Sequence, residues 1–252
     1  MQTVPPNDDA MTVPLASVGC AQATRLSVIV PVLDEAPAIS GRLAALHVLR
    51  QRGAELIVVD GGSRDATGDL ARAVADRFLV AARGRATQMN AGARAGHGEV
   101  LLFLHADTTL PAEADVLILQ AVAGGAWWGR FDVTIDGRHR LLRVVERMMN
   151  LRSRLTGIAT GDQAIFVRQD VFARIGGFPE LPLMEDIALS QRLRRLARPA
   201  CLRARVLTSG RRWEENGVVR TILLMWSLRL RYFLGADPAR LAVRYGYAAR
   251  EP

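Results

Sequence analysis

Polar side chains able to bind a cation or a sugar stand directly after three apolar segments of this 252-residue sequence. They are Asp34 and Glu35, Asp60, and His105 and Asp107. Carboxylates that share one site repel one another unless a cation or hydrogen-bond donors lie between them. The pattern therefore predicts a site for a metal ion or for a ligand rich in hydroxyl and N–H groups. The alternative interpretation is that each acid only caps the helix that follows it.

The elements that carry these residues alternate between strands and helices. Apolar, β-branched runs typical of strands buried on both faces cover residues 26–33, 55–60, 78–81 and 99–104. Helical patterns cover residues 37–50, 64–77, 86–95 and 111–123. This alternation predicts an α/β fold with a mostly parallel sheet flanked by helices. Ligands of such sheets bind beyond the carboxyl ends of the strands, where the acids stand.

The regular alternation of strands and helices ends after Gly125, and the later elements are more widely spaced. Strand patterns cover residues 127–135, 163–168 and 200–208, and helical patterns cover residues 139–154, 185–196 and 218–234. The segment before residue 25 contains three prolines and has no clear period. We therefore expect a flexible tail over residues 1–24, one α/β domain over 25–217 and a helical extension with an amphipathic helix over 218–252.

Composition excludes several classes of function. The formal net charge is +8. The chain has 33 arginines and no lysine. The absence of lysine excludes Schiff-base chemistry and a P-loop, and no G-x-G-x-x-G follows the first strand. Aromatic residues make up only 6% of the chain, which argues against a nucleic-acid partner bound by base stacking.

The same counts suggest a cellular location. Cys20 and Cys201 form no metal-ligand pair, so we expect free thiols in a reducing cytoplasm. No run of about 18 apolar residues predicts a transmembrane helix. The acidic N-terminus, with Asp8 and Asp9, is unlike a secretory signal.

Five segments in order resemble family 2 glycosyltransferases of the GT-A fold: VIVPVLDE (28–35), VVDGGSRDAT (58–67), LLFLHADT (101–108), GDQAIFVRQDVFARIGGF (161–178) and MEDIALSQRLRR (184–195). RGRATQMNAGA (83–93) and SGRRWEENG (209–217) are similar to one bacterial subgroup, the radical-SAM/selenodomain-associated or arsenosugar-biosynthesis glycosyltransferases. The resemblance covers about residues 25–240. It implies an inverting enzyme that moves a sugar from a nucleotide-sugar donor, with a UDP-sugar favoured. The acceptor is a hydroxyl or carboxyl group on a small metabolite or a lipid-like, lipid-linked molecule.

The resemblance also implies a donor pocket at the strand ends. Its expected members are Pro31, Asp34, Glu35, Asp60, Arg85, Gln88 and Asn90. The first three would line the base and ribose, and Asp60 would contact the nucleobase. Arginine forks match phosphate geometry, and amides can bind the edge of a sugar or base. The alternative for Asp34 is a turn residue.

His105-Ala106-Asp107 stands where the family has its metal-binding D-x-D. The resemblance implies that Asp107 coordinates a divalent metal, Mn²⁺ or Mg²⁺, that bridges the donor diphosphate, with His105 as a second ligand. Imidazole suits Mn²⁺ better than Mg²⁺. The alternative for His105 is an ordinary core histidine that binds no metal.

The acceptor side of the site is expected in the second half of the chain. By resemblance, Asp186 is the general base, with Glu185 as the second candidate, and Asp162 and Gln163 hold the sugar or acceptor. The competing view is that the acidic pair only complements a helix dipole. Arg212 would hold the diphosphate and Trp213 would stack on a sugar ring. The alternative for Trp213 is a buried anchor for its loop.

The segment 218–235 combines arginines with large apolar residues, which is typical of a helix that lies on an anionic membrane. The expected location is therefore cytoplasmic, with peripheral contact to the inner face of the cell membrane. The alternative is that this helix packs on its own domain or on a second subunit. Two rival functions remain: a sugar-1-phosphate nucleotidyltransferase, and a homologue that binds a nucleotide sugar without turnover.

Overall fold

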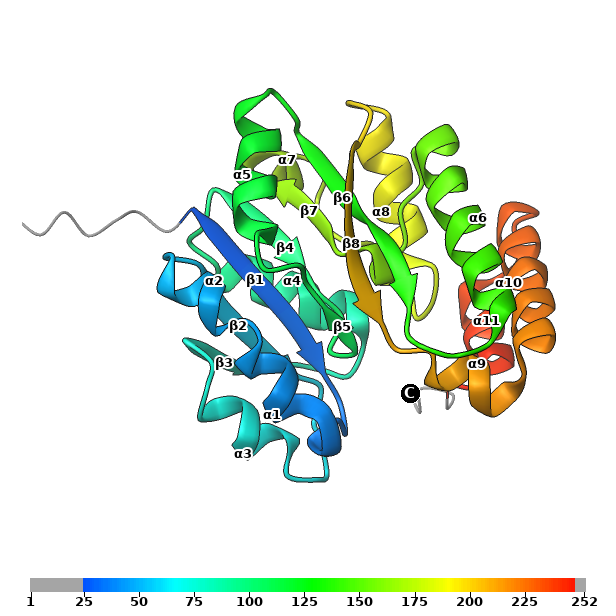
Figure 1. Cartoon of the computed structure of the whole chain (residues 1–252), viewed down its shortest axis with the longest axis horizontal. Helices are drawn as coiled ribbons and strands as arrows, with labels where there is room; N and C mark the ends of the chain where they lie inside the picture. The colour runs from blue at the N-terminus through cyan, green and yellow to red at the C-terminus, as the bar shows by residue number, and fades with distance from the viewer. Residues whose placement is uncertain (1–24, 248–252) are drawn as a thin grey trace, which may run out of the picture.

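Eight strands form one mixed sheet through the computed structural model, which describes residues 25–247 (Figure 1). They are β1 (Leu26–Val32), β2 (Glu55–Asp60), β3 (Arg77–Val80), β4 (Val100–Phe103), β5 (Thr108–Thr109), β6 (Trp128–Ile135), β7 (Ile165–Arg168) and β8 (Ala200–Thr208). Their order is β3-β2-β1-β4-β7-β6-β8-β5. The tail expected over residues 1–24, with Cys20, lies outside the described residues.

The helices are α1 (Ala36–Ala44), α2 (His47–Gln51), α3 (Thr67–Arg72), α4 (Arg85–Ala95), α5 (Ala114–Ala123), α6 (Arg140–Thr156), α7 (Gln169–Arg174), α8 (Glu185–Arg194), α9 (Arg211–Asn216), α10 (Val218–Phe233) and α11 (Pro238–Tyr245). A single 3₁₀ turn, η1, covers Gly161–Gln163. Two of these helices, α7 and α9, lie in segments where we expected none, and α11 lies within the expected helical extension. The helix expected over residues 37–50 is divided into α1 and α2.

The first half of the sheet is parallel, as the alternation predicted. Strand β1 pairs in parallel with both β2 and β4, so the carboxyl ends of these strands open onto one edge. The second half is mixed, because β7 runs antiparallel to both β4 and β6. The mixed α/β sheet with helices on both faces confirms the expected GT-A fold class.

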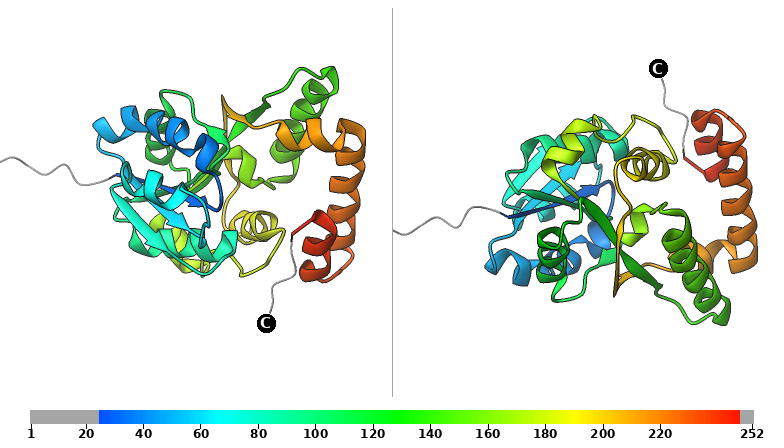
Figure 2. Two further views of the ribbon diagram at one scale, coloured as in Figure 1. Left: turned by 90° about the horizontal axis from the view of Figure 1, so that it is seen from below. Right: turned by 90° about the horizontal axis from the view of Figure 1, so that it is seen from above.

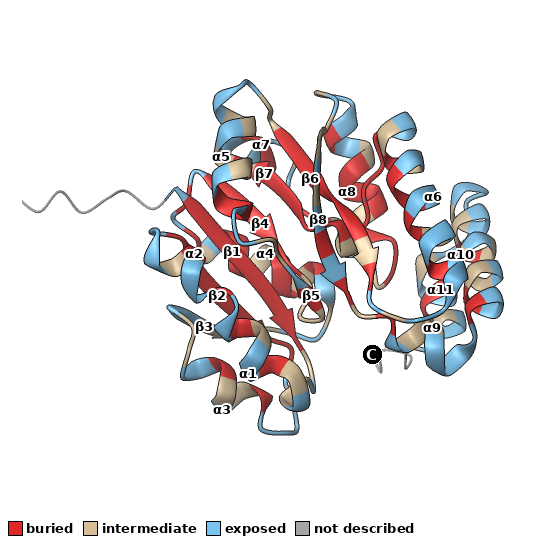
Figure 3. Cartoon of the chain, in the orientation of Figure 1, coloured by how far each residue is buried: buried red, intermediate tan, exposed pale blue. Residues whose placement is uncertain are grey.

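The central strands β1, β2, β4, β6 and β7 are buried on both faces, whereas β3 and β8 are partly exposed (Figure 3). Successive residues of the buried strands contribute to opposite cores. In β1, Val28 and Val30 belong to the core under α1, α2, α5 and α6, whereas Ile29 belongs to the core under α4, α7 and α8. This period of two is what a strand dictates. The two helical layers hold the strand ends in place, and with them the acids of the site.

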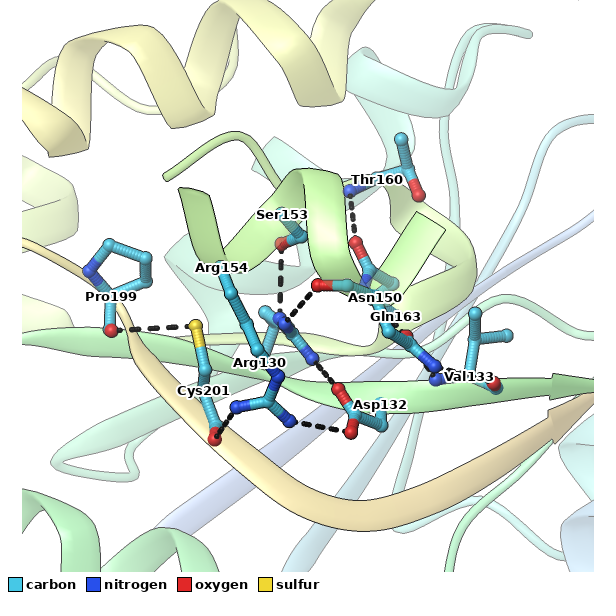
Figure 4. A network of polar contacts seen from close by, with 10 residues as sticks. All are labelled: Arg130, Asp132, Val133, Asn150, Ser153, Arg154, Thr160, Gln163, Pro199 and Cys201. Carbon is cyan, nitrogen blue, oxygen red and sulfur yellow. Dashed lines mark hydrogen bonds and ion pairs between the residues drawn. The ribbon is translucent and has the colours of Figure 1, made fainter. Parts of the chain in front are cut away.

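A polar network joins α6 to the sheet (Figure 4). Arg130 of β6 is fully buried; it pairs with Asp132 and donates to Ser153 Oγ at 3.0 Å. Asn150 exchanges hydrogen bonds with both main-chain groups of Val133, at 2.9 and 3.1 Å. A buried charge is tolerated only when it is paired and hydrogen-bonded, and this network meets that condition. It therefore fixes α6 and the loop that follows it.

Helices α10 and α11 form a layer at the end of the molecule away from β3 (Figure 2). Leu228 and Leu241 pack with Met184 and Ile187, at the start of α8. One face of the helix expected over 218–235 thus packs on its own domain, and the division of the chain at residue 217 stays a prediction. Within residues 25–247, no helix is long and apolar enough to cross a membrane.

Candidate active site at the carboxyl ends of the strands

The ends of β1 and β2 are tied together by a set of short polar contacts. Asp34 has a left-handed backbone, with φ of 52°, and its Oδ1 accepts from Arg64 N at 2.8 Å. Ser63 Oγ accepts from Asp34 N at 3.0 Å and donates to Asp60 Oδ1 at 2.6 Å. Glu35 N donates to Thr67 Oγ1 at 2.7 Å. The exposed Asp34 and the buried Asp60 therefore stand at one rim in a fixed arrangement.

Three of the expected donor residues are used by the protein itself. Gln88 is buried and donates both amide hydrogens, to Val32 O at 2.9 Å and Val59 O at 2.8 Å. Asn90 is bound at both ends of its amide by the main chain of Phe178, at 2.9 Å each. Pro31 is buried inside β1. These side chains position the strands and a loop, and the expectation that they contact the donor stays a prediction.

Asp107 and Glu35 come close enough for their charges to interact across the ends of β4 and β1. Burial raises the pKa of Glu35, and the neighbouring Asp107 raises it further. Thr108 Oγ1 donates to Asp107 Oδ1 at 3.2 Å. Two carboxylates held near each other favour a cation between them.

His105 is turned away from that pair toward the loop before β7. Its Nδ1 lies 3.3 Å from Asp162 Oδ1. A Cβ on Gly161 would lie 2.1 Å from His105 Nε2, so only glycine allows this ring to pack there. Both ring nitrogens thus face the loop, and the expectation that His105 is a metal ligand stays a prediction that this geometry does not favour. The alternative, a histidine that packs in the core, fits this geometry.

The acidic pair predicted at residues 185–186 begins α8. Met184 precedes it in a left-handed conformation, with φ of 69°, which is strained for a residue with a side chain. Asp186 is half-buried; its Oδ2 accepts from Gly161 N at 2.9 Å and its Oδ1 from Ile187 N at 2.7 Å. These contacts aim the Asp186 carboxylate and join α8 to the loop that carries Asp162.

Glu185 points into the protein and is 3% exposed. Its Oε1 lies 3.5 Å from Nη1 of Arg85, at the start of α4. Burial raises the pKa of Glu185, Arg85 opposes this effect, and Asp186 adds to it. Burial disfavours the charged form of Arg85, but Tyr247, Glu185 and Tyr245 outweigh it and raise its pKa. Of the two acids, Asp186 is the one that a ligand can reach.

Gln163 is fully buried and cannot touch a ligand (Figure 4). Its Oε1 accepts from Thr160 N at 3.2 Å, and its Nε2 donates to Asn150 Oδ1 at 3.4 Å. The expectation that it holds the sugar or acceptor is corrected accordingly. Its neighbour Asp162 is half-buried. Burial opposes ionisation of Asp162, but His105 and Arg85 outweigh it and lower the pKa of this carboxyl.

The late basic–aromatic motif packs against the C-terminal helices and the core. Arg212 stacks on the ring of Tyr245, with its guanidinium carbon 3.9 Å from the ring centre, and donates to Tyr245 O at 3.2 Å. Trp213 is half-buried and packs against the core. The diphosphate and sugar contacts expected of this pair stay predictions; the alternative, a buried anchor, fits Trp213.

Sequence reasoning missed three features of the site. Tyr245 and Tyr247 pack edge to face with ring centres 5.0 Å apart, and both act electrostatically on Arg85. Arg152 of α6 has two buried nitrogens, Nε and Nη2, without a hydrogen-bond partner. Burial lowers the pKa of Arg152 to about 10, Arg229 contributes to this shift, and Asp186 opposes it. The tyrosine pair could have been found from the RYGY segment (244–247), which brings two tyrosines together in a chain with few aromatic residues.

A divalent metal fits part of this donor set. No cluster of three His, Cys, Asp or Glu side chains within residues 25–247 has the geometry of a metal site. Mg²⁺ and similar ions are nevertheless often held by one or two carboxylates together with substrate phosphates. The Asp107 carboxylate, with Glu35 beside it, suits that arrangement, and the covered His105 does not.

Comparison with solved structures identifies the fold. The mannosyltransferase PcManGT from Pyrobaculum calidifontis, solved with GDP-Man and Mn²⁺, is 23% identical with a TM-score of 0.60, covering 89% of this chain and 65% of its own. S. aureus TarS in complex with UDP-GlcNAc is 19% identical with a TM-score of 0.59, over 73% of this chain. Glucosyl-3-phosphoglycerate synthase from Mycobacterium tuberculosis, solved with Mn²⁺, UDP and glucosyl-3-phosphoglycerate, is 19% identical with a TM-score of 0.55, over 75% of this chain and 72% of its own. The chain spans about 58% of the TarS structure.

These likenesses show that the chain has the GT-A fold. Residues 27–173, more than half of the chain, match glycosyl transferase family 2. The chain belongs to this family of glycosyltransferases. No curated protein matches the sequence.

Proposed function

We propose that this protein transfers a sugar from a nucleotide-sugar donor to an acceptor hydroxyl or carboxyl group, with inversion at the anomeric carbon. The observation that carries the proposal is a continuous chain of contacts. His105, two residues before Asp107, meets Asp162, and Gly161 N binds Asp186. Asp107, proposed for the diphosphate side, and Asp186, proposed to accept the acceptor proton, are thereby held at one rim.

In the proposed reaction, the acceptor oxygen attacks the anomeric carbon from the face opposite the nucleoside diphosphate. Asp186 accepts the proton of the acceptor hydroxyl, and the bond between the anomeric carbon and the diphosphate breaks. The electron pair of that bond leaves with the diphosphate. The main-chain N–H groups of Gly161 and Ile187 orient the Asp186 carboxylate for this step. A carboxylate acceptor would need no base, so the role of Asp186 distinguishes the two acceptor types.

The donor is assigned to the rim formed by β1, β2 and β4. Asp34 and Asp60 are the proposed contacts for the ribose and base, because carboxylates accept from hydroxyl and N–H groups. A UDP-sugar is favoured, in line with the UDP bound by two of the similar structures. Asp107 is the proposed ligand of Mn²⁺ or Mg²⁺, which when bound offsets the charge on the departing diphosphate.

The acceptor is assigned to the side of the site that carries Asp186, next to Arg152. Arg152 keeps two buried nitrogens without partners, and an acidic group on the acceptor would satisfy them. A small phosphorylated or carboxylated metabolite and a lipid-linked phosphate both meet this condition. Tyr247, beside Tyr245, is the proposed contact for a sugar or acceptor ring. We assign the chain to the arsenosugar-type bacterial subgroup on its RGRATQMNAGA and SGRRWEENG segments.

The two rival functions predict different reactions. A sugar-1-phosphate nucleotidyltransferase would release pyrophosphate from a nucleoside triphosphate, and we disfavour it because the chain has no lysine. A non-catalytic homologue would bind a nucleotide sugar and release no nucleoside diphosphate. The assays below separate all three.

The test is a thermal-shift screen of UDP, GDP, CMP and dTDP, each with Mn²⁺, Mg²⁺ or EDTA. A nucleotide at about 100 times its dissociation constant should stabilise the protein by about 2.7 kcal/mol. We expect one nucleotide to stabilise it in the presence of metal, and release of that nucleoside diphosphate from the matching sugar donor when acceptor is added. If no nucleotide shifts the transition under any metal condition, the proposal is wrong.

A further inference from the structure

Helix α10 has an apolar face that points away from the rest of the protein. Thr221 and Leu228 of this helix are buried against the domain. The opposite face carries five large side chains at helical spacing, each 57–62% exposed: Val219, Leu223, Trp226, Leu230 and Phe233. A helix that is apolar on both faces requires a second apolar environment on its outer side. The C-terminal helix was expected either to pack on the domain or to contact a partner outside it. Each alternative thus applies to one face of α10, the first to the inner face and the second to the outer face.

Helix α6 repeats the pattern. Leu142, Met149 and Ser153 face the sheet and are buried. The opposite face exposes Leu141, Val144, Met148, Leu151 and Leu155. Helices α6 and α10 contact each other and lie side by side at the same end of the molecule (Figures 1 and 2). Ten exposed apolar side chains on two adjacent helices exceed the scattered apolar residues of an ordinary surface and indicate a binding surface.

The charge within α6, α10 and α11 is almost entirely positive, whereas the neighbouring α9 carries Glu214 and Glu215. Helix α6 contains five arginines, α10 three and α11 two, and the one acid within the three helices is Glu146. Glu146 is buried, where it accepts from Ile135 N and pairs with Arg143. The nearby Asp237 caps α11 through Ala239 N. The surface is therefore suited to an anionic partner.

A basic pocket of about 300 Å³ lies between α9, α10 and α11. It is lined by three arginines, Arg212, Arg220 and Arg244, together with Asn216 and Thr221, and by no carboxylate among the described residues. Arg220 and Arg244 are exposed, so their guanidinium groups are open to solvent. Guanidinium groups around a pocket of this size suit a phosphate.

We propose that the outward faces of α6 and α10 dock onto an anionic phospholipid bilayer, and that the exposed Arg220 and Arg244 contact lipid phosphates. Apolar stripes flanked by arginines, with Trp226 among the exposed residues, are what an interfacial helix presents to such a surface. A second copy of the chain is a poorer occupant, because pairing through this face would bring arginines against arginines. The proposal does not depend on glycosyl transfer.

The test is co-sedimentation of the purified chain with vesicles, in the absence of any nucleotide sugar. We expect binding to phosphatidylcholine vesicles that contain about 30% phosphatidylglycerol, little binding to phosphatidylcholine alone, and weaker binding as salt rises. The fluorescence of Trp226 reports how deeply the outer face of α10 enters the bilayer. Brominated acyl chains should quench part of the tryptophan fluorescence of the wild-type protein, and that part should be absent in Trp226→Phe, which keeps an apolar residue in place.

Matched variants separate the apolar and the basic contributions. Trp226→Glu with Leu230→Glu should weaken vesicle binding by about tenfold or more, whereas Val116→Glu, an exposed site on α5, should not. Arg220→Gln with Arg244→Gln should weaken binding to anionic vesicles by about tenfold. The control with the same loss of charge is Arg94→Gln with Arg203→Gln, on exposed parts of α4 and β8. Thermal melting of each variant checks that the fold is kept.

Three outcomes would overturn the proposal. The first is binding that ignores both lipid charge and the α10 substitutions. The second is a concentration-dependent dimer, seen by light scattering, that Trp226→Glu with Leu230→Glu abolishes; the face would then join two copies. The third is stabilisation by inorganic phosphate that requires Arg220 and Arg244 without any vesicle binding, which would indicate a site for a free phosphate. None of these outcomes bears on nucleotide binding, so the proposed transferase activity is tested separately.

Discussion

Arg85 at the first residue of α4 faces Glu185 at the first residue of α8, with Nη1 3.5 Å from Oε1, although the two are 100 residues apart in sequence. The Glu185 side chain is almost completely buried, and the Arg85 side chain is 40% exposed. The contact joins the half of the sheet assigned to the donor to the helix that carries Asp186. A change on the donor side of the site therefore reaches the Asp186 side through this contact, and the reverse.

Replacing Arg85 by glutamine should destabilise the protein by about 1–2 kcal/mol, because a buried carboxylate loses its cation while solvent reaches part of the site. The measurement is the free energy of unfolding in urea. The matched control is Arg168→Gln, whose partner Asp170 is exposed; it should change stability by less than about 0.5 kcal/mol. Equal effects of the two variants would mean that the Arg85–Glu185 contact does not contribute to stability.

The raised pKa of Glu185 predicts a pH dependence of stability. Folding favours the protonated form, so the contribution of Glu185 is most favourable below its ordinary value of 4.5 and declines as pH rises through its raised pKa. Glu185→Gln removes this decline. The unfolding free energy of the variant should therefore gain on that of the wild type as pH rises, by at most about 1.4 kcal/mol per pH unit.

Asp76 provides the control of opposite sign. Partial burial opposes the effect, but hydrogen bonds from Arg50 and Leu56 N lower the pKa of Asp76. The stabilisation by Asp76 is present above its ordinary pKa of 3.8 and is lost as pH falls. The unfolding free energy of the wild type should therefore fall relative to that of Asp76→Asn in acid. A Glu185 series with the same slope as the Asp76 series would contradict the assignment.

Asp186→Asn should lower the rate of glycosyl transfer to a hydroxyl acceptor by about 10²–10⁴-fold, because asparagine cannot accept the proton. Its Oδ1 can still accept from Gly161 N, so the fold and donor binding should be kept. The measurement is turnover together with donor affinity. An unchanged rate with a hydroxyl acceptor would mean that Asp186 is not the base.

Asp107→Asn should abolish the metal-dependent part of nucleotide binding, because it removes the one carboxylate assigned to the cation. His105→Ala should keep that dependence, since both ring nitrogens already face the Gly161–Asp162 loop. Calorimetric titration of the nucleotide with and without Mn²⁺ distinguishes the two variants. Loss of metal dependence in both would restore His105 as a ligand and require the ring to turn.

Trp213 and Tyr247 should have opposite effects when each is replaced by leucine. Trp213 packs against the core, so its loss should lower stability by about 1–3 kcal/mol and leave the acceptor KM unchanged. Tyr247 is half-buried beside Tyr245, near Arg85, so its loss should raise the acceptor KM with little change in stability. The reverse result would restore Trp213 as the residue that stacks on the ligand.

Much of the fold could be predicted because it is written in local patterns. Buried strands such as Glu55–Asp60 need continuous apolar residues, and their ends follow directly in the sequence. The short antiparallel strand β5 and helix α7 were missed, because their stability comes from packing on distant elements rather than from their own periodicity. The predicted helix over 64–77 is shorter, since Ser63, Arg64 and Asp65 bind the end of β1 instead.

The sequence by itself determined that acids stand at the ends of parallel strands and that an acidic pair opens a later helix. Only the tertiary structure decided which polar groups remain free. Gln88, Asn90 and Gln163 have the chemistry to bind a sugar, but other groups of the protein take up their amides: distant main-chain groups for Gln88 and Asn90, and Thr160 N with the Asn150 side chain for Gln163. A side chain offers a ligand only the hydrogen bonds that folding leaves unused, and those partners lie far apart in the chain. The same reasoning holds for α6 and α10, whose arginines and apolar residues gain their meaning only when the fold places the two helices side by side.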